Sequence, residues 1–436
     1  MLSFLGGIHP YDGKNLSKDE HIKEFFPEGE IVIPVSQHIG APAVPIVQKG
    51  DEVMVGDLIA KAGGYVSANI HSSVSGTVKG IEKRMLLSGV KGDCIIIDND
   101  KQFSKRQEYT KEDVSGLSSE EIKNRIQDAG IVGMGGAGFP THVKLSPKEP
   151  DKIDYIIVNG AECEPYLTSD YRRMIESPDE IIEGLNIMMK LFDNCKGVIA
   201  VEDNKSDAIK LLKEKIKAYE NISVATLKTK YPQGAERMLV YAVTGRKLNS
   251  SMLPADKGCI VDNIDTVHAI YRAVCYKEPL TRRIVTLTGD GIAAPCNYSV
   301  PIGTNHRELI ERNGGFNGEP EKIISGGPMM GVAMHTLDVP IVKTSSAVLA
   351  FMEDELKSTK QTNCINCGRC LQVCPGRVMP TRLAEFSDRN DMENFLKYDG
   401  LECCECGCCS YICPAKRDLT QSIKSMRKIA LSMRKK

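Results

Sequence analysis

Cys364-x2-Cys367-x2-Cys370-x3-Cys374-Pro375 and Cys403-x2-Cys406-x2-Cys409-x3-Cys413-Pro414 are two copies of one pattern near the end of this 436-residue chain. The 28 residues between Cys374 and Cys403 carry apolar side chains at helix-like positions, including Leu383 and Phe395. Two equal cysteine runs joined by a helical segment predict one small helical domain with two equivalent ligand sites. We expect this domain at residues 355–420, followed by a basic helix at 421–436.

The cysteine spacing is the ligand pattern of 4Fe–4S clusters in bacterial two-cluster ferredoxins, where the fourth cysteine of each run ligates the other cluster. This crossing assigns the first cluster to Cys364, Cys367, Cys370 and Cys413. It assigns the second cluster to Cys403, Cys406, Cys409 and Cys374. Cys404 and Cys408 lie off the spacing and stay unassigned. The pattern therefore predicts two 4Fe–4S clusters close together and the transfer of single electrons.

Structural zinc and disulfides are the alternatives to clusters. Zinc sites need four ligands, normally two from each of two Cys-x2-Cys knuckles, so a repeated run of three cysteines plus a fourth fits zinc poorly. Disulfides are disfavoured because cysteines at this density suit reduced thiolates and the chain shows no secretory leader. We therefore interpret the runs as cluster ligands.

Composition sets outer limits on the function. The length leaves room for about three domains, and 42% of the residues are hydrophobic. The formal net charge of −1 argues against a nucleic-acid binder. No stretch approaches the roughly 20 apolar residues that a membrane-spanning helix needs. We expect a soluble protein of a reducing, intracellular compartment.

The N-terminal part, residues 1–110, carries a β-rich core at 30–100 with glycine-rich turns. It resembles the barrel-sandwich fold of biotinyl and lipoyl carrier domains. The lysine that carries the prosthetic group in those domains is missing, because the expected turn reads Val66-Ser67-Ala68-Asn69-Ile70. We therefore expect the carrier fold without the swinging-arm function, and a structural role for His71.

The middle of the chain alternates helix and strand patterns. Ser118-x-x-Glu121 has the form of a capping box that opens a helix. Strands are predicted at 154–159, 197–201, 222–227 and 259–262. This alternation predicts an α/β domain at 117–278 around a mostly parallel sheet, followed at 280–350 by a β-grasp (SLBB-like) module. The predicted fold class is multidomain α/β.

Residues Gly130 to Gly138 hold five glycines in nine positions, which lets the backbone approach a ligand and aim several N–H groups at a phosphate. A Rossmann fingerprint would follow a strand, whereas this loop follows a predicted helix. Taken alone, the loop could also be a structural turn. Lys144, just downstream, could add a cation. Asn159-Gly160-Ala161-Glu162-Cys163-Glu164-Pro165 places carboxylates at a strand end, where α/β folds bind ligands.

Four segments look like the flavin and NADH motifs of the NADH-oxidising subunit of respiratory complex I, in the same order: 133–144, 159–165, 234–236 and 262–266. The resemblance implies that FMN contacts Gly133, Gly135, Gly136, Lys144, Asn159, Glu162, Asn263 and Thr266. Gly138 belongs to the same loop, and Gly234 belongs to the third motif, which closes the pocket. Phe139 would stack on the NADH adenine, with Glu164 and Glu236 near the nucleotide. Met134 and Ala161 depart from the family, which usually has arginine and aspartate there.

The opening Phe4-Leu5-Gly6-Gly7-Ile8-His9-Pro10, the carrier-like domain and the two-cluster tail together resemble the C subunits of Rnf complexes over nearly the whole chain. The resemblance implies a peripheral NADH-oxidising or NAD-reducing subunit on the cytoplasmic face of the cell membrane. Its implied cofactors are FMN and two 4Fe–4S clusters, with NAD(H) as substrate. The whole complex is an NAD:ferredoxin oxidoreductase that moves sodium ions or protons, and its other subunits are the implied partners.

Two other functions stay open at this stage. A cobalamin reductase of bacterial microcompartments is built from the same modules. A flavin-free iron–sulfur relay would keep the cysteine domain and lose the flavin chemistry. NADH is favoured over NADPH because the acidic second motif would repel a 2′-phosphate. The basic tail helix could meet anionic lipid or an acidic partner, although a solvated face is the commoner explanation for such a helix.

Overall fold

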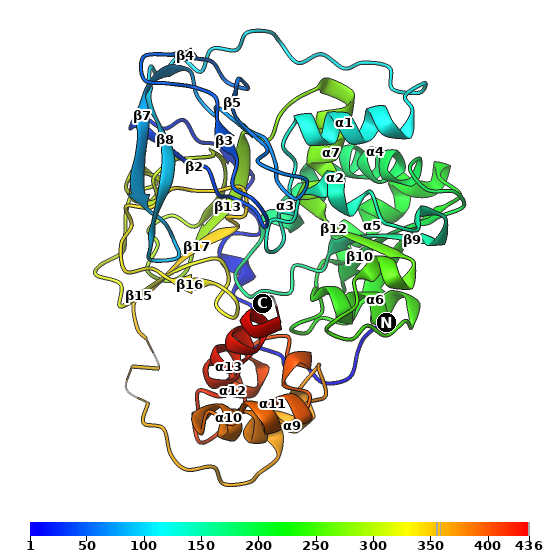
Figure 1. Ribbon diagram of the computed structural model, residues 1–436, viewed down its shortest axis with the longest axis vertical. Helices are drawn as coiled ribbons and strands as arrows, with labels where there is room; N and C mark the ends of the chain where they lie inside the picture. The colour runs from blue at the N-terminus through cyan, green and yellow to red at the C-terminus, as the bar shows by residue number, and fades with distance from the viewer. Residues whose placement is uncertain (355, 358, 435–436) are drawn as a thin grey trace.

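The computed structural model describes residues 1–354, 356–357 and 359–434. Along the chain it forms an N-terminal β domain, an α/β domain, a second β-rich module and a helical cysteine domain (Figure 1). The cysteine domain lies at one end of the long axis, below the other three in Figure 1. The predicted start of this domain at residue 355 and the predicted helix end at 436 lie outside the described residues.

The N-terminal β domain packs two sheets face to face. One has the strand order β2 (Ile31–Pro34), β8 (Lys91–Asn99), β7 (Gly76–Met85) and β4 (Glu52–Val53). The other holds β3 (Val44–Pro45), β5 (Leu58–Lys61) and β6 (Ile70–His71). Alternate residues point inward, and Ile31, Ile33, Ile95 and Ile97 are fully buried between the sheets. The long β7–β8 hairpin projects beyond this core towards the second β-rich module (Figure 1).

The turn at which carrier domains display their lysine is buried here. Ala68 is 1% exposed and packs in the core of the α/β domain with Ile122 and Ile126. The Asn69 carbonyl accepts a hydrogen bond of 2.6 Å from the Lys343 ammonium. The turn is therefore an attachment point between domains.

The α/β domain is built on a parallel sheet in the order β11 (Ile222–Leu227), β10 (Lys196–Glu202), β9 (Tyr155–Gly160) and β12 (Cys259–Asn263). Its first helix, α1 (Ser119–Asp128), begins with the predicted capping box, in which Ser118 and Glu121 bond each other's backbone N–H groups. Asn263 of β12 lies beside Asn159 of β9 in register. The sheet thus brings two predicted site residues together at its carboxyl edge.

Helices α4 (Pro178–Met189) and α7 (Ile264–Tyr276) pack against each other beside this sheet (Figure 1). The apolar residues of β9, β10, α4 and α7 share one core, including Ile156, Ile199, Leu185 and Ile270. This core fixes the start of α7, where Asn263 caps the helix by accepting a bond from the Asp265 N–H. The second and fourth predicted motifs therefore sit on rigid elements.

The second β-rich module has six strands in the order β1 (Ile22–Glu24), β14 (Cys296–Pro301), β13 (Arg282–Thr288), β17 (Ala347–Phe351), β15 (Lys322–Ser325) and β16 (Val332–Ala333). Helix α8 (His306–Arg312) contributes Leu309 and Ile310 to its core. Strand β1 comes from the N-terminal segment and pairs in parallel with β14, which the sequence did not predict. The module therefore receives an edge strand from far away in the chain.

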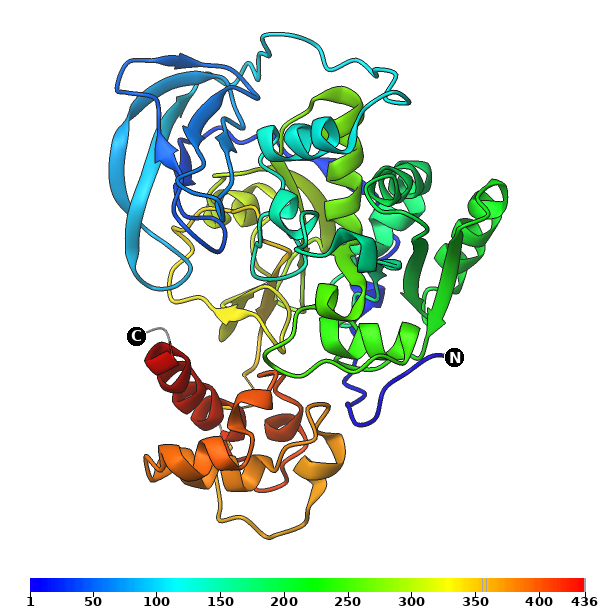
Figure 2. The ribbon, with the colours of Figure 1, turned by 45° about the vertical axis from the view of Figure 1, so that its right-hand side comes forward.

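The cysteine domain consists of short helices around Leu383, Phe395 and Ile423. They are α9 (Arg369–Val373), α10 (Pro380–Asp388), α11 (Met392–Lys397), α12 (Cys408–Tyr411) and α13 (Leu419–Arg434). The N-terminal segment runs close to this domain (Figure 2), and the Gly7 N–H donates to the Val373 carbonyl at 2.8 Å. The same segment exchanges backbone hydrogen bonds between Ile8 and Tyr231 of the α/β domain. It thus links the two domains.

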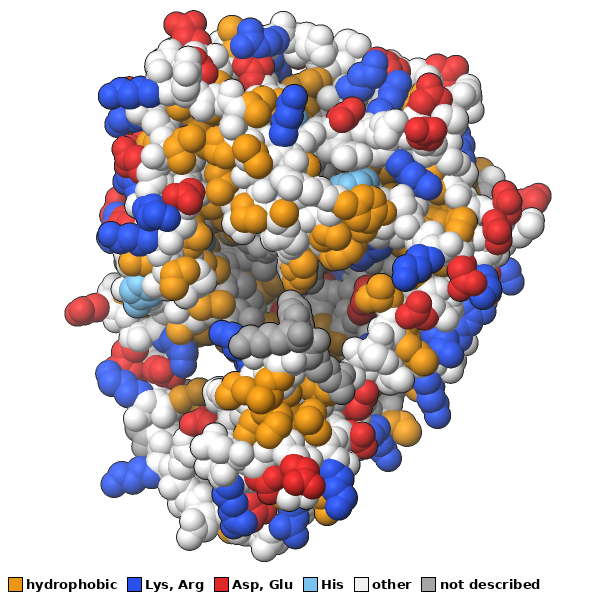
Figure 3. All heavy atoms as spheres, viewed as in Figure 1, with side chains coloured by type: hydrophobic (Ala, Val, Ile, Leu, Met, Phe, Trp, Pro, Cys, Tyr) orange, Lys and Arg blue, Asp and Glu red, His pale blue; other side chains and the backbone are white. Residues whose placement is uncertain are grey.

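Acidic and basic side chains are interspersed over the face seen in Figure 3, in keeping with the net charge of −1. Among the helices within the described ranges, none is both long and apolar enough to cross a bilayer.

Candidate functional site

A cavity of about 380 Å³ lies where the α/β domain meets the second β-rich module. Its floor is formed by the glycine loop and the carboxyl ends of β9 and β12. Its other walls come from residues 325–332 and 342–346, and Leu87 reaches it from the β7–β8 hairpin. The face in Figure 3 is hollowed at its centre, between the β-rich half and the α/β domain. A cavity of this size at a domain junction is typical of a cofactor site.

The structure brings residues of all four predicted motifs to this cavity. The predicted residues that line it are Gly135, Gly136, Asn159, Glu162, Glu164, Gly234 and Asn263. Gly135 lies close to Asn263, since a Cβ added to it would come 2.8 Å from the Asn263 Cβ. Asn159 holds the third motif by donating to the Gly234 carbonyl at 2.9 Å. Gly135 and Asn263, which are 128 positions apart in the chain, thus belong to one surface.

Other predicted residues do not line this cavity. They are Gly133, Gly138, Phe139, Lys144, Glu236 and Thr266. Gly133 closes the base of the loop, because its N–H donates to the Phe139 carbonyl at 2.9 Å. Thr266 fixes the loop from below, since its hydroxyl accepts a bond of 2.9 Å from the Met134 N–H. Gly133, Phe139 and Thr266 thus shape the loop, while the adenine contact of Phe139 and the cation role of Lys144 stay predictions.

Lys144 is engaged with protein groups. Its ammonium donates to the Val261 carbonyl at 2.7 Å and to the Asp262 carboxylate at 3.1 Å, and Glu236 lies 3.9 Å away. Burial disfavours the charged form, but Asp262 and Glu236 outweigh it and raise the pKa of Lys144. The ammonium therefore stays charged and neutralised at the edge of the sheet.

The acids of the cavity are strongly desolvated. Burial, with Glu162 and Asp265 nearby, raises the pKa of Asp170 to about 7. Burial also raises the pKa of Glu164 to about 7, against hydrogen bonds from the backbone of Met329 and Met330. Within the described residues, Oε1 of Glu164 is buried without a hydrogen-bond partner. An unsatisfied buried oxygen of this kind suits a ligand that donates a hydrogen bond, such as a ribose hydroxyl or an amide.

Two residues of the cavity were missed by sequence reasoning. Asp170, in α3 (Ser169–Glu176), accepts a hydrogen bond of 2.7 Å from Asn263. Arg283 reaches the cavity from β13 and is the one Lys or Arg among its described lining residues. The sequence 283–289 reads as an ordinary strand, so no local signal marked Arg283. Met134, where the resembling family has arginine, is 2% exposed and places its sulfur 2.9 Å from Nη1 of Arg283.

The cysteine domain contains two further small cavities. One is lined by Cys364, Cys367, Cys370 and Cys413. The other is lined by Cys374, Cys403, Cys406 and Cys409, with Cys404 and Cys408 beside them. Each cavity therefore combines three cysteines of one run with the fourth of the other. In the described part of the chain, no three His, Cys, Asp or Glu side chains meet at a single-ion site.

The 380 Å³ cavity and the second cysteine cavity are close neighbours. Cys163 lines the first cavity and packs in one apolar cluster with Tyr231, Met329, Cys406 and Cys408. Tyr231 is 2% exposed, and burial raises its pKa far above the ordinary range. The space between the two cavities is therefore filled by packed side chains.

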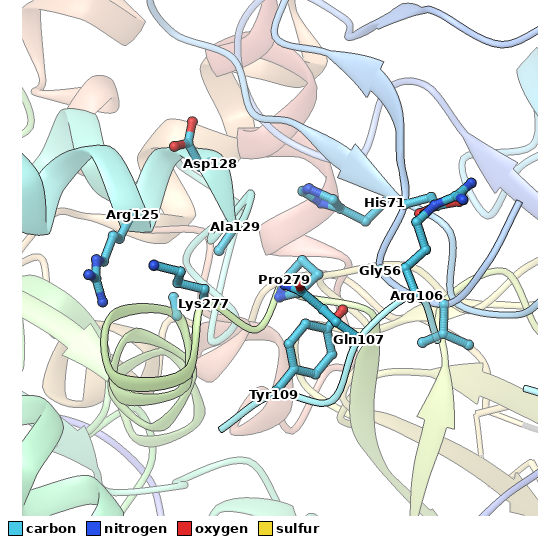
Figure 4. Close-up of a pocket in the computed structure, with 13 residues that line it drawn as sticks. Gly56, His71, Arg106, Gln107, Tyr109, Arg125, Asp128, Ala129, Lys277 and Pro279 are labelled. Carbon is cyan, nitrogen blue, oxygen red and sulfur yellow. The ribbon is translucent and has the colours of Figure 1, made fainter. Parts of the chain in front are cut away.

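Another cavity, of about 460 Å³, lies between the N-terminal β domain, the segment 106–109 and the α/β domain (Figure 4). Its charged side chains are mostly paired: Arg106 forms a two-pronged bond with Asp57, while Arg125 and Lys277 both contact Glu112. His71 faces it from β6, and burial lowers the pKa of His71 to about 3, which keeps the imidazole neutral. None of the predicted cofactor residues lines this cavity.

The sequence matches three family descriptions in chain order. They are the RnfC Barrel sandwich hybrid domain over residues 2–102, the Nuo51 FMN-binding domain over residues 126–272 and the SLBB domain over residues 284–333. The predicted fold class is thereby confirmed. The fold resembles NAD+-reducing [NiFe]-hydrogenase in the air-oxidized state, with a TM-score of 0.51 and 19% identity over 64% of this chain and 54% of that one. At this identity the likeness concerns the fold.

Fold and cavity thus define a flavoprotein of the class built on the Nuo51 FMN-binding domain. The C subunit of the proton-translocating ferredoxin:NAD(+) oxidoreductase complex of Clostridium ljungdahlii is 45% identical over 98% of this chain and 94% of its own length. The C subunit of the Na(+)-translocating complex of Acetobacterium woodii is 41% identical over 100% and 98%. The C subunit of an ion-translocating oxidoreductase complex from Rhodobacter capsulatus is 40% identical over 91% and 77%.

The chain belongs to this family, the C subunits of ion-translocating ferredoxin:NAD(+) oxidoreductase (Rnf) complexes. The resemblance drawn from the sequence motifs is confirmed. The chain is an oxidoreductase subunit for NADH- and FMN-linked electron transfer, and among the alternatives the family favours this one over cobalamin reduction and over a flavin-free relay.

Proposed function

We propose that this chain carries electrons between NAD(H) and the other subunits of its complex through FMN and two 4Fe–4S clusters. It would work as a peripheral subunit at the cytoplasmic face of the membrane, held there by its partners. The observation that carries the proposal is the crossed composition of the two cysteine cavities, three thiols from one run and one from the other. Crossing is the arrangement that two-cluster ferredoxins use.

The 380 Å³ cavity fits a flavin mononucleotide. Gly135 and Gly136 offer an open backbone, Asn159 and Asn263 offer amides, and the unpaired Glu164 oxygen offers an acceptor. Bound FMN would supply the conversion between the two-electron chemistry of NADH and the one-electron chemistry of the clusters. The protein's part is to fix the flavin position and to exclude water, because no side chain here needs to act as a general base.

The cysteines would hold the clusters in the sets that line each cavity. Cys374, Cys403, Cys406 and Cys409 would bind the cluster nearer the flavin, because Cys406 and Cys408 pack against Tyr231 and Cys163. Cys364, Cys367, Cys370 and Cys413 would bind the outer cluster, where Cys367 is exposed and Cys364 is partly exposed. The outer position suits electron exchange with a partner subunit.

Metal and flavin content test the proposal directly. We expect anaerobically reconstituted protein to contain about eight irons, as many sulfides, and one FMN per chain. We also expect NADH to bleach the flavin absorbance. Zinc in place of iron would contradict the cluster assignment. Iron without flavin, and without a response to NADH, would reduce the protein to an iron–sulfur relay.

The crossing has its own test. Cys413→Ser should damage the cluster bound by the first cysteine run, and Cys374→Ser the cluster bound by the second run. Combining Cys413→Ser with Cys364→Ser should add little to the first damage, whereas combining it with Cys403→Ser should damage both clusters. Iron content and electron paramagnetic resonance of the reduced variants measure this. If Cys413→Ser with Cys403→Ser instead damages one cluster, and Cys413→Ser with Cys364→Ser damages both, each run keeps its own fourth ligand.

A further inference from the structure

The cavity proposed for FMN has an electrostatic problem. An FMN phosphate carries about −1.5 to −2 charges at neutral pH, yet three carboxylates line the cavity: Glu162, Glu164 and Asp170. Burial raises the pKa of Glu164 and of Asp170 to about 7, which lowers this negative charge without making the site positive. A phosphate bound here needs a cation beyond the glycine-loop N–H groups.

The cation expected from sequence is not free. The Lys144 ammonium is shared by the Val261 carbonyl and by the Asp262 carboxylate, and Lys144 does not line the cavity. The other cation of this site type would stand at position 134, where this chain has Met134. Both sequence positions therefore leave the phosphate without an available charge.

Arg283 is a cation that does line the cavity. It lies on β13 of the second β-rich module, and its side chain is only 3% exposed. Nε donates to the Ser345 carbonyl at 3.1 Å, and Nη1 contacts the Met134 sulfur and the Asp265 carboxylate. Within the described residues, Nη2 makes no hydrogen bond. The guanidinium is thus held against Met134 of the glycine loop, and its Nη2 group is free to donate hydrogen bonds to a ligand.

Asp265 neutralises the charge of Arg283 only in part. Arg173 bonds the other oxygen of the same carboxylate at 2.9 Å, so two guanidinium groups share one acid. This trio carries a surplus of one positive charge at the start of α7. Guanidinium groups bind phosphate oxygens through paired, charge-assisted hydrogen bonds.

We infer that Arg283 binds the FMN phosphate and supplies the cation that the glycine loop lacks at Met134. The inference rests on the proposed function, since it names a binding residue of the same site. It also gives the second β-rich module a role, because that module delivers the phosphate ligand from outside the flavoprotein domain.

Comparing FMN with riboflavin isolates the phosphate contact. Flavin-free protein, with its clusters reconstituted, is titrated with each flavin and binding is followed by quenching of flavin fluorescence. The wild type should prefer FMN clearly. Arg283→Gln should weaken FMN binding by roughly 10- to 100-fold, which corresponds to the loss of a charge-assisted hydrogen bond, and should leave riboflavin binding within about threefold. The FMN affinity of Arg283→Lys should lie between those of the wild type and Arg283→Gln. Adding Met134→Arg to Arg283→Gln should restore part of the preference.

Arg282→Gln is the matched control. Arg282 is the neighbouring residue of the same strand, but its guanidinium bonds the Phe25 and Ser299 carbonyls and pairs with Glu24, away from the cavity. This variant should keep the FMN preference. If Arg283→Gln weakens the binding of FMN and riboflavin equally, or weakens neither, the inference is overturned while the proposed function stays intact. A wild type that binds both flavins equally would overturn it without any variant. A wild type that binds neither flavin would overturn the proposed function itself.

Discussion

Replacing Glu402 by alanine should loosen the cysteine domain from the flavoprotein domain. Glu402 directly precedes Cys403, and its carboxylate accepts hydrogen bonds of 2.7 Å from Arg237, 2.7 Å from the Ser250 hydroxyl and 2.9 Å from the Ser250 N–H. The Glu402 carbonyl accepts a further bond of 2.7 Å from Arg237. One side chain thus joins the second cysteine run to α6 (Glu236–Thr244) and to the segment that follows it.

The structure sets the size of the expected effect. A hydrogen bond to a charged group contributes about 1.5 to 3 kcal/mol, and partial exposure reduces this value. The Glu402 side chain is 28% exposed and that of Arg237 is 18% exposed. Losing three bonds to the carboxylate should therefore weaken docking by about 2 to 4 kcal/mol, while the variant leaves the Arg237 contact to the Glu402 carbonyl in place.

Hydrogen exchange in α6 and in residues 400–406 is the direct assay, because weaker docking exposes both segments. The matched control is Glu385→Ala, since Glu385 has 33% side-chain exposure and its ion pairs within the described ranges are with Arg382 and Arg389 of the cysteine domain itself. Glu402→Ala should exchange faster by a factor of ten or more and should slow cluster reduction by NADH. If the two variants exchange alike, the Glu402 contacts do not hold the domains together.

The same contacts make docking sensitive to acid. Burial opposes ionisation of Glu402, but hydrogen bonds from Ser250 and Arg237 outweigh it and lower its pKa below the ordinary 4.5. A lowered pKa means that the stabilisation is complete above 4.5 and is lost as the pH falls through the folded-state pKa. The difference in hydrogen exchange between wild type and Glu402→Ala should therefore shrink in that acid range and stay constant from pH 6 to 8.

Two further predictions concern the glycine loop and its support. Gly135→Ala should weaken FMN binding strongly, because its Cβ would lie 2.8 Å from the Asn263 Cβ, whereas Gly136→Ala meets nothing within 4 Å. Equal flavin affinities of these two variants would contradict the loop geometry. Lys343 is buried and has no carboxylate partner among the residues that the structure describes, and burial lowers its pKa to about 7. Between pH 7 and about 10.4 the unfolded chain then binds more protons than the folded chain, so this residue makes stability rise with pH by up to about 1.4 kcal/mol per unit. The melting-temperature difference between wild type and Lys343→Met should therefore shift in favour of the wild type from pH 7 to 9, and a constant difference would refute the buried-ammonium reasoning.

Sequence reasoning succeeded where the signal is local. The cysteine spacing, the capping box at Ser118 and Glu121, and the strand at 222–227 depend on neighbours within a few residues, and the structure contains the helix start and the strand as predicted. The motif order also sufficed to gather Gly135, Asn159 and Asn263, since the parallel sheet aligns strand ends. Arg283 and Asp170 were missed because a remote strand and a helix must pack together to bring them to the cavity, and such packing produces no periodic pattern in the sequence.

At position 144, motif matching located a residue without predicting which protein groups its ammonium contacts. The lysine fits the expected pattern, yet Asp262 follows in the fourth motif and takes its ammonium. A carboxylate at 3.1 Å in a buried setting binds a cation far more strongly than a solvated one would. The contact of Lys144 with the FMN phosphate stays a prediction.

The carrier-like domain likewise differs from a carrier because of its neighbours in the fold. In a carrier, the turn at positions 66–70 must stay exposed so that its lysine can move between sites. Here Ala68 is buried in the α/β core, and the Lys343 ammonium donates to the carbonyls of Asn69 and Gly130, the residue that opens the glycine loop. At the other end of that loop, the Ile39 N–H donates to the Gly138 carbonyl at 3.3 Å. A turn buried and bonded in this way cannot swing, and the β domain forms a fixed wall of the 380 Å³ cavity, which Leu87 reaches from the hairpin.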